Sequence, residues 1–240
     1  MLNFTIKDTR THLDLDLRSD RVKSNVLLVE YFFHLVEKIQ PQCSFELGAF
    51  TADFSRKIKQ QLPSTKIYAF EANPHNYQYV LANFELEGIT YINKALWNEN
   101  KTLAFNLQTK INGQNVNKVV GNNSVLERHA INFECEVVDV EGITLSSFIN
   151  ENNLKNKSSV LWIDVEGASK EVLNGCVDVL DDVKLIFIEV EEVRFWKKQW
   201  LESDVNAFLK DAGFTLIARD GEYPKQYNQI YIKNSLLGIV

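Results

Sequence analysis

The chain is predicted to fold as an α/β domain, with a mostly parallel sheet and helices on both of its faces. Two observations predict this class. From Cys43 onward, short runs rich in β-branched and aromatic residues alternate with longer helical patterns, as in successive βαβ units. The last two runs are joined through Asp220 and Gly221, which is typical of a hairpin at an antiparallel edge of the sheet. We therefore expect seven strands in a single domain, residues 1–240.

The N-terminal part, residues 1–42, is expected to contain an irregular arm and one helix. Its first 24 residues are polar and mixed in charge, which favours the arm. Residues 25–40 are predicted to form the helix, because apolar residues recur on more than one face, Ser24 or Asn25 can cap the start, and Pro41 follows the end.

The elements that follow are bounded by residues that favour helix ends or turns. Gly48 follows the first strand, Asn73 and Pro74 can open a helix, Gly175 can end another, and Ser203 can cap the last. The expected strands are 43–47, 66–70, 89–96, 160–163, 184–190, 214–218 and 229–233, and the expected helices are 51–62, 73–86, 144–150, 169–173 and 203–211.

The alternation of strands and helices stops between residues 101 and 142. Residues 102–107 and 133–140 are predicted to be the strands of an inserted hairpin. The segment between them is polar and rich in Asn and Gly, and a segment of this length without regular structure is usually functional or mobile. We expect it to act as a lid, within which residues 121–124 either reach over a ligand or form a solvated loop.

Composition excludes several classes of function. The net charge is −6 and no dense run of Lys and Arg occurs, so no nucleic-acid partner is expected. The N-terminus lacks the order of a secretory signal, and Glu30 and His34 interrupt the richest apolar stretch, so we expect no membrane partner and a cytoplasmic location. Three cysteines without a CxxC pair indicate neither a disulfide framework nor a zinc site, and we expect them to be buried and reduced.

Residues 45–52 read as a strand, a glycine turn and the start of a helix, which is typical of a nucleotide-type site. A free helix N-terminus offers backbone N–H groups to an anionic ligand group. Gly48 is the one glycine of this turn, so neither a dinucleotide fingerprint nor a P-loop is present. Glu71 ends the second strand, where Rossmann-type folds hold ribose hydroxyls. An adenosine with an amino-acid tail fits this pattern, and S-adenosylmethionine is such a molecule.

Four motifs, in order along residues 45–190, resemble those of the FkbM family of S-adenosylmethionine-dependent methyltransferases, a Rossmann-like class I group. They are FELGA at 45–49, YAFEANP at 68–74, NKAL at 93–96, and WIDVEGA at 162–168 with VLNG at 172–175. Phe50, Ala52 and Ala72 depart from the Asn, Gly and Pro that are common in the family. The resemblance implies methyl transfer to a hydroxyl of a small molecule or sugar, with a cofactor site formed by Glu46, Gly48, Ala49, Phe50, Glu71, Ala72, Ala95 and Asp164.

Asp164 and Glu166 are the candidate catalytic residues. They follow a buried strand at alternate positions, so they project to the same side if the extended geometry persists to Gly167. Asp164 can act as the general base or orient the acceptor, with Glu166 as the second candidate. Glu189 ends the next strand and can join Asp164 in binding a divalent cation such as Mg²⁺.

Alternative interpretations remain open for these acids and for the whole chain. Asp164 and Glu166 can be solvated turn residues, Glu166 can bond the N–H groups of the following helix, and Glu46 can brace its own loop. The chain can also be a non-catalytic relative that binds an adenosine-type ligand as a regulatory or scaffold protein. A nicotinamide oxidoreductase is disfavoured by the missing glycines.

Overall fold

A computed structural model describes residues 7, 8, 10, 12–130 and 132–240, and six residues of the expected N-terminal arm, 1–6, lie outside this range together with 9 and 11. The main sheet has the strand order β1-β11-β12-β10-β9-β2-β3-β4. In the described part of the chain it contains the seven expected strands and a two-residue addition, β1. Its strands are β1 (Lys7–Asp8), β2 (Cys43–Leu47), β3 (Lys66–Phe70), β4 (Ile89–Ile92), β9 (Ser159–Ile163), β10 (Val183–Glu191), β11 (Phe214–Arg219) and β12 (Gln226–Lys233).

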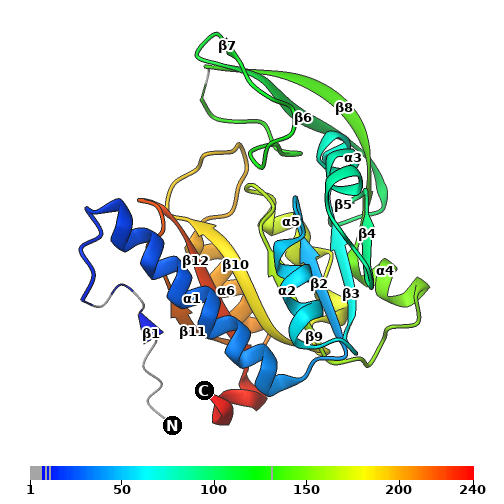
Figure 1. Ribbon diagram of the computed structural model, residues 1–240, viewed down its shortest axis with the longest axis vertical. Helices are drawn as coiled ribbons and strands as arrows, with labels where there is room; N and C mark the ends of the chain where they lie inside the picture. Colours follow the sequence, from blue (N-terminus) through cyan, green and yellow to red (C-terminus); the bar gives the residue numbers. More distant parts are fainter. Residues whose placement is uncertain (1–6, 9, 11, 131) are drawn as a thin grey trace.

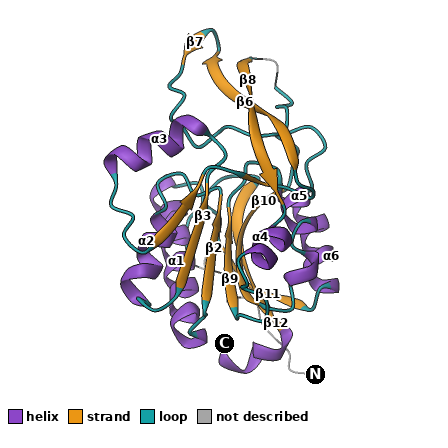
Figure 2. Cartoon of the chain, turned by 90° about the vertical axis from the view of Figure 1, so that its right-hand side faces the viewer, coloured by secondary structure: helices purple, strands orange, loops and turns teal. Residues whose placement is uncertain are grey.

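Helices cover both faces of this sheet, as predicted (Figure 2). One face packs against α1 (Arg18–Ile39) and α2 (Asp53–Gln61), through a core that contains Phe32, Ile58 and Phe187. The opposite face packs against α4 (Leu145–Glu151), α5 (Ser169–Asn174) and α6 (Glu202–Asp211). None of the helices in the described ranges is long and apolar enough to span a membrane.

The closing strands form the predicted antiparallel hairpin at one end of the sheet. Strand β12 is antiparallel to both of its neighbours and lies between β10 and β11. Strand β11 is therefore parallel to β10, and only β12 runs against the rest of the main sheet. A long connection through α6 carries the chain to β11, and residues 220–225 then return it into the gap between β10 and β11. The tight turn lies at Pro224 and Lys225, closed by a bridge between Tyr223 and Gln226, and not at Asp220 and Gly221, through which the sequence predicted the strands to be joined.

Helix α1 begins at Arg18, seven residues before the predicted start. Residues 18–24 contain no glycine or proline, so nothing in them interrupts the helix. Ser24 is buried inside α1 instead of capping it, and its Oγ accepts a hydrogen bond from the backbone N–H of Gly221 at 3.1 Å. Helix α6 likewise begins at Glu202 rather than at a Ser203 cap, and Asp204 accepts from the N–H of Leu201.

The predicted strand 89–96 is divided between two sheets. Strand β4 ends at Ile92, and β5 (Ala95–Leu96) instead pairs with β8 (Phe133–Ile143) in a second sheet of order β5-β8-β6-β7. The break occurs at Asn93, whose side chain donates to the carbonyl of Glu71 at 2.8 Å. This change of sheet brings Ala95 and Leu96 under the inserted segment.

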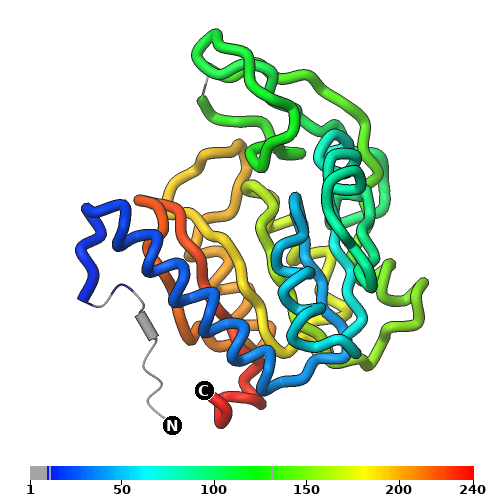
Figure 3. Tube along the Cα trace, in the orientation of Figure 1, coloured from blue at the N-terminus to red at the C-terminus, as the bar shows by residue number. Residues whose placement is uncertain are grey.

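The inserted segment is built on an antiparallel pair, β6 (Lys101–Ile111) and β8, with β7 (Gln114–Asn115) at its tip. Both long strands extend beyond their predicted ends. The pair projects past the carboxyl ends of the main sheet, and the trace then returns from the tip toward that sheet (Figures 1 and 3). Helix α3 (Pro74–Asn83) lies below it, and Asn73 caps α3 as predicted, accepting from the N–H of His75 at 2.9 Å.

Candidate active site

The carboxyl ends of β2, β3 and β9 meet at one point of the sheet, around the turn at Gly48. The N–H groups of Gly48 and Ala49 both donate to the carbonyl of Phe70, and the N–H of Asp164 donates to the carbonyl of Leu47 at 2.9 Å. Gly48 has a φ of +84°, and a Cβ atom there would be 1.7 Å from the carbonyl oxygen of Asp164. The turn after β2 and the loop after β9 are thus in direct contact, which only glycine permits.

Glu71 is buried at the end of β3 and accepts hydrogen bonds from both sides of this turn. Its Oε2 accepts from the backbone N–H of Phe50 at 2.8 Å, and its Oε1 accepts from the N–H of Asn73 at 2.7 Å. Burial raises the pKa of Glu71 to about 7, although these hydrogen bonds oppose the shift. Oε1 also accepts a longer bond from the amide of Asn76, at 3.4 Å. Each carboxylate oxygen can accept two hydrogen bonds, so Oε2 is the oxygen that retains a lone pair for a ligand hydroxyl.

The helix N-terminus after Gly48 is not the free anion site that the sequence predicted. Glu46 is buried and its carboxylate accepts from the N–H groups of Phe54 at 3.3 Å and Ser55 at 2.9 Å, in the first turn of α2. The N–H groups of 48, 49 and 50 are also bonded within the chain, to Phe70 and Glu71. The chain's own acceptors therefore satisfy these donors, and the contacts of Glu46 support the alternative in which it braces the turn.

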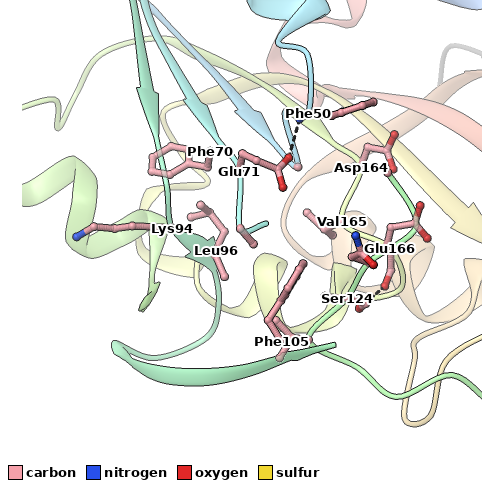
Figure 4. A pocket seen from close by; sticks show the side chains of 17 residues that line it. Phe50, Phe70, Glu71, Lys94, Leu96, Phe105, Ser124, Asp164, Val165 and Glu166 are labelled. Carbon is pink, nitrogen blue, oxygen red and sulfur yellow. Dashed lines mark hydrogen bonds between the residues drawn. The ribbon is translucent and has the colours of Figure 1, made fainter. Parts of the chain in front are cut away.

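A cavity of about 720 Å³, which includes the solvent at its opening, lies beside Glu71. Ligand pockets of small molecules are commonly of this size and largely apolar. Glu46 and Ala49 do not line this cavity. Seven of the predicted cofactor and catalytic residues do: Gly48, Phe50, Glu71, Ala72, Ala95, Asp164 and Glu166. Glu71 lies across the cavity from Asp164 and Glu166, and Phe105 and Ser124 close the side formed by the inserted segment (Figure 4).

Phe105 was missed as a site residue by sequence reasoning. Along β6, Leu103, Phe105 and Leu107 are buried while Thr102 and Ala104 are exposed. That period of two was visible in the sequence and marks one face of β6 as packed against something. What it packs against, namely the cavity and Ala168, depends on where the hairpin folds and could not be read from the pattern.

Beyond Ile163 the backbone is not extended, contrary to the prediction that Asp164 and Glu166 follow strand geometry to Gly167. Glu166 and Gly167 have φ values of +48° and +83°. Trp196 packs so closely against Gly167 that a Cβ atom on the glycine would be 2.3 Å from Cδ1 of the tryptophan. This contact explains why position 167 is a glycine. Asp164 and Glu166 still line the cavity, and the carboxylate of neither makes a hydrogen bond to another described residue. Helix α5 has no side-chain cap, so the capping role considered for Glu166 is not observed.

Burial and mutual repulsion raise the pKa values of the acids around this loop. Asp164 is open to the solvent in the cavity, yet the surrounding protein desolvates it enough to raise its pKa to about 6. The pKa of Glu166 is raised to about 8 by desolvation and by Asp164, with Arg128 opposing. Desolvation together with Asp164 and Glu166 also raises the pKa of Glu189 well above its usual value.

The predicted cation site at Asp164 and Glu189 is not supported. No group of three or more His, Cys, Asp or Glu side chains within the described ranges is arranged to hold a metal ion. One oxygen of Glu189 is already bonded to the amide of Gln226 at 2.8 Å. Because Mg²⁺ and Ca²⁺ need several converging oxygen ligands, this geometry does not provide them. Of the three cysteines, Cys43 and Cys176 are buried as expected, whereas Cys135 is exposed.

Residues 118–128 connect the inserted segment to both walls of the cavity. On one side the amide groups of Asn73 and Asn76 donate to the carbonyls of Lys118 and Val120, at 2.8 and 3.0 Å. On the other side Ser124 Oγ donates to the carbonyl of Glu166 at 2.7 Å. Further along, Arg128 pairs with Trp196 in an isolated antiparallel bridge.

The strand order, the glycine turn and the buried acid that ends the second parallel strand define a Rossmann-like, class I methyltransferase fold. The sequence profile of the methyltransferase FkbM domain matches residues 41–216. This match spans more than half of the chain, and the chain belongs to the FkbM methyltransferase domain family. The resemblance seen in the sequence is thereby confirmed.

Solved structures of other methyltransferases are similar to this chain at low sequence identity. Methyltransferase FkbM from Methylobacillus flagellatus KT is 9% identical with a TM-score of 0.48, over 80% of this chain and 44% of that one. Magnesium protoporphyrin IX methyltransferase from Synechocystis PCC 6803 is 10% identical with a TM-score of 0.43, over 94% and 88%. Precorrin-6y C5,15-methyltransferase from Geobacter metallireducens GS-15 is 13% identical with a TM-score of 0.41, over 82% and 86%. Comparison with curated proteins gave no match.

Proposed function

We propose that the protein is an S-adenosylmethionine-dependent O-methyltransferase whose acceptor is a hydroxyl of a small molecule or sugar. Membership of a methyltransferase family supports the reaction class. The observation that carries the proposal for this chain is the cavity that has Glu71 on one wall and Asp164 and Glu166 on the other (Figure 4). The wall with Glu71 can bind a ribose, and the wall with Asp164 and Glu166 can accept a proton from the acceptor hydroxyl.

The residues beside Glu71 fit an adenosine. Oε2 of Glu71 keeps acceptor capacity for a ribose hydroxyl, and the carboxylate is held in position by the N–H groups of Phe50 and Asn73 and by the amide of Asn76. Ala72, Ala95 and Phe105 supply an apolar lining on which a flat purine ring can pack. Gly48 brings the backbone of the first turn against the loop of Asp164, so a ligand that spans both has a continuous surface.

When bound, S-adenosylmethionine supplies a methyl group already activated by its sulfonium. The protein then has to orient the acceptor hydroxyl and take its proton, and positioning of this kind contributes several kcal/mol. Asp164 is the better placed base of the two acids, because its side chain is the more open to the cavity. Desolvation raises the pKa values of both acids, and the charge of Asp164 raises that of Glu166 further, so the pair favours sharing a proton. When Glu166 holds that proton, it can donate a hydrogen bond to the acceptor.

The test is an isothermal titration of S-adenosylhomocysteine into wild-type protein, Glu71→Ala and the exposed control Glu87→Ala. We expect wild type and Glu87→Ala to bind alike, and Glu71→Ala to bind at least tenfold more weakly, because the hydrogen bonding of the ligand to this carboxylate is lost. Absence of binding by the wild-type protein would overturn the proposal. Binding without transfer of a radiolabelled methyl group to any hydroxyl compound would instead favour the non-catalytic relative.

A further inference from the structure

A second cavity, of about 990 Å³ with the solvent at its opening, meets the first at Asp164 and Glu166. It lies between α1 and the ends of β9, β10 and β12, so it is on the far side of the candidate catalytic acids from Glu71. Val29, Trp162 and Phe187 contribute its apolar surface. This is the space that remains for an acceptor once the first cavity holds the adenosine.

Most amide N–H donors on the wall of this second cavity are already used within the protein. The amide of Asn25 donates to Asp220 and Glu222, both at 3.0 Å. The amide of Asn228 donates to the same two carboxylates, again at 3.0 Å, and Gln226 donates to Glu189 at 2.8 Å. The amide oxygens of these three side chains are left as acceptors. Asn122, Trp162 and Tyr223 are the remaining side-chain donors of the wall.

The charges on this wall all have the same sign. Asp164, Glu166, Glu189 and Glu222 line the cavity, and no Lys, Arg or His does so among the described residues. Arg128 is near enough to lower the pKa of Glu166, whereas desolvation and then neighbouring acids raise the pKa values of Glu189 and Glu222. These acids therefore repel one another when ionised, and a cationic ligand group beside them would favour their ionised form. S-adenosylmethionine, with a net charge near +1, offsets only part of this repulsion.

We propose that the methyl acceptor carries at least one protonated amino group, which binds to Glu189 and Glu222 while its reacting hydroxyl faces Asp164. The inference rests on the proposed function and narrows its acceptor to the class of amino alcohols and amino sugars. An ammonium group has three N–H donors and no acceptor, which complements a wall of carboxylate and amide oxygens. A neutral polyol would need donors from the wall for its own hydroxyl oxygens, and the wall has few.

The test uses three four-carbon probes that differ only in their end groups: 1,4-diaminobutane, 4-amino-1-butanol and 1,4-butanediol. Each is titrated into protein saturated with S-adenosylhomocysteine, at neutral pH and physiological salt so that loose surface attraction is screened. We expect affinity to fall from the diamine to the amino alcohol to the diol, with at least a tenfold difference between the first and the last. Glu189→Gln and Glu222→Gln should each weaken diamine binding at least fivefold, whereas Glu192→Gln, at an exposed neighbouring position, should not.

The outcomes separate this inference from the proposed function. Failure of the wild-type protein to bind S-adenosylhomocysteine would overturn the proposed function, and this inference with it. If S-adenosylhomocysteine binds but the diol binds as well as the diamine, or no amine binds at millimolar concentration, the acceptor class is wrong. Unchanged diamine binding in Glu189→Gln would also overturn it. Glu222 accepts two hydrogen bonds within the protein, so Glu222→Gln can fail to fold. In that case diamine binding by Glu189→Gln decides whether the acceptor class is right.

Discussion

Gly48 and the carbonyl oxygen of Asp164 are so close that a Cβ atom on the glycine would lie 1.7 Å from that oxygen. The contact joins the turn that follows β2 to the loop that follows β9. The same loop carries both candidate catalytic acids, so the distance between the cofactor wall and the catalytic wall is set by backbone contact. A change at Gly48 therefore tests the fold and the site together.

Gly48→Ala should lower the free energy of unfolding by roughly 2–5 kcal/mol, since it combines overpacking with a left-handed backbone. The matched control is Gly113→Ala. Gly113 has a similar φ of +76°, but nothing lies within 4 Å of its Cβ position, so only the backbone strain of about 1–2 kcal/mol applies. Urea unfolding of both variants measures the difference. Equal losses in the two variants would show that the contact with Asp164 relaxes freely.

Glu46 and Glu71 are both buried acids near the glycine turn, yet their substitutions should have opposite signatures. Glu46→Ala leaves the N–H groups of Phe54 and Ser55 without acceptors, which should cost about 1–3 kcal/mol for each unsatisfied group. It should change the affinity of the folded protein for S-adenosylhomocysteine less than threefold, because Glu46 does not line the cavity. Glu71→Ala should abolish most of that affinity. Thermal unfolding and calorimetric titration of both variants decide between bracing and binding for Glu46.

Ser124 is predicted to hold residues 121–128 against the catalytic loop through its 2.7 Å hydrogen bond to the carbonyl of Glu166. Ser124→Ala should cost about 1 kcal/mol of stability. Amide hydrogen exchange should become faster in residues 121–128 and 164–167 specifically. Ser147→Ala is the control, because Ser147 also bonds through its hydroxyl but lies at the start of α4. Exchange in 121–128 that responds equally to both variants would contradict the predicted role.

The order of elements was predictable because each strand of the main sheet is a short apolar run bounded by residues with clear turn or cap chemistry. Asn73 with Pro74 is an example, and its cap is found where the sequence placed it. Propensity failed where tertiary contacts decide. Residues 89–96 are mostly β-branched, aromatic or apolar, but the chain leaves the sheet at Asn93, where that side chain bonds to the carbonyl of Glu71. Ser24 is a residue type that favours helix N-caps, but it lies inside α1, where it is buried in contact with Gly221.

Within the site, motif positions were predictable and their bonding was not. Glu71 and Asp164 lie at strand ends, where sequence order alone places them. The occupied helix N-terminus depends on Glu46, whose buried carboxylate reaches Ser55, nine residues along the chain. Phe50 and Ala52 have φ values of +35° and +56°, a conformation favoured by Asn and Gly. The family commonly has those two residues at these positions, so the departures place strain in the turn rather than remove the turn.

The last prediction concerns pH and follows from the raised pKa values of the buried acids. Burial raises the pKa of Glu46, Glu166 and Glu191 to about 8 and that of Glu71 to about 7, above the ordinary value of 4.5. Between about pH 4.5 and pH 8 the folded protein therefore binds more protons than the unfolded chain, so the free energy of unfolding should fall as the pH rises through this window. Acids with lowered pKa values, such as exposed Glu192, exert the opposite effect below pH 4.5.

Urea unfolding at pH 5.5, 6.5 and 7.5 measures how steeply the free energy of unfolding falls with pH. Glu191→Gln should make this slope shallower because one such group is removed, and Glu192→Gln should leave it unchanged. Stability that rises across this window in the wild-type protein would show that these acids are ionised in the folded state at little cost.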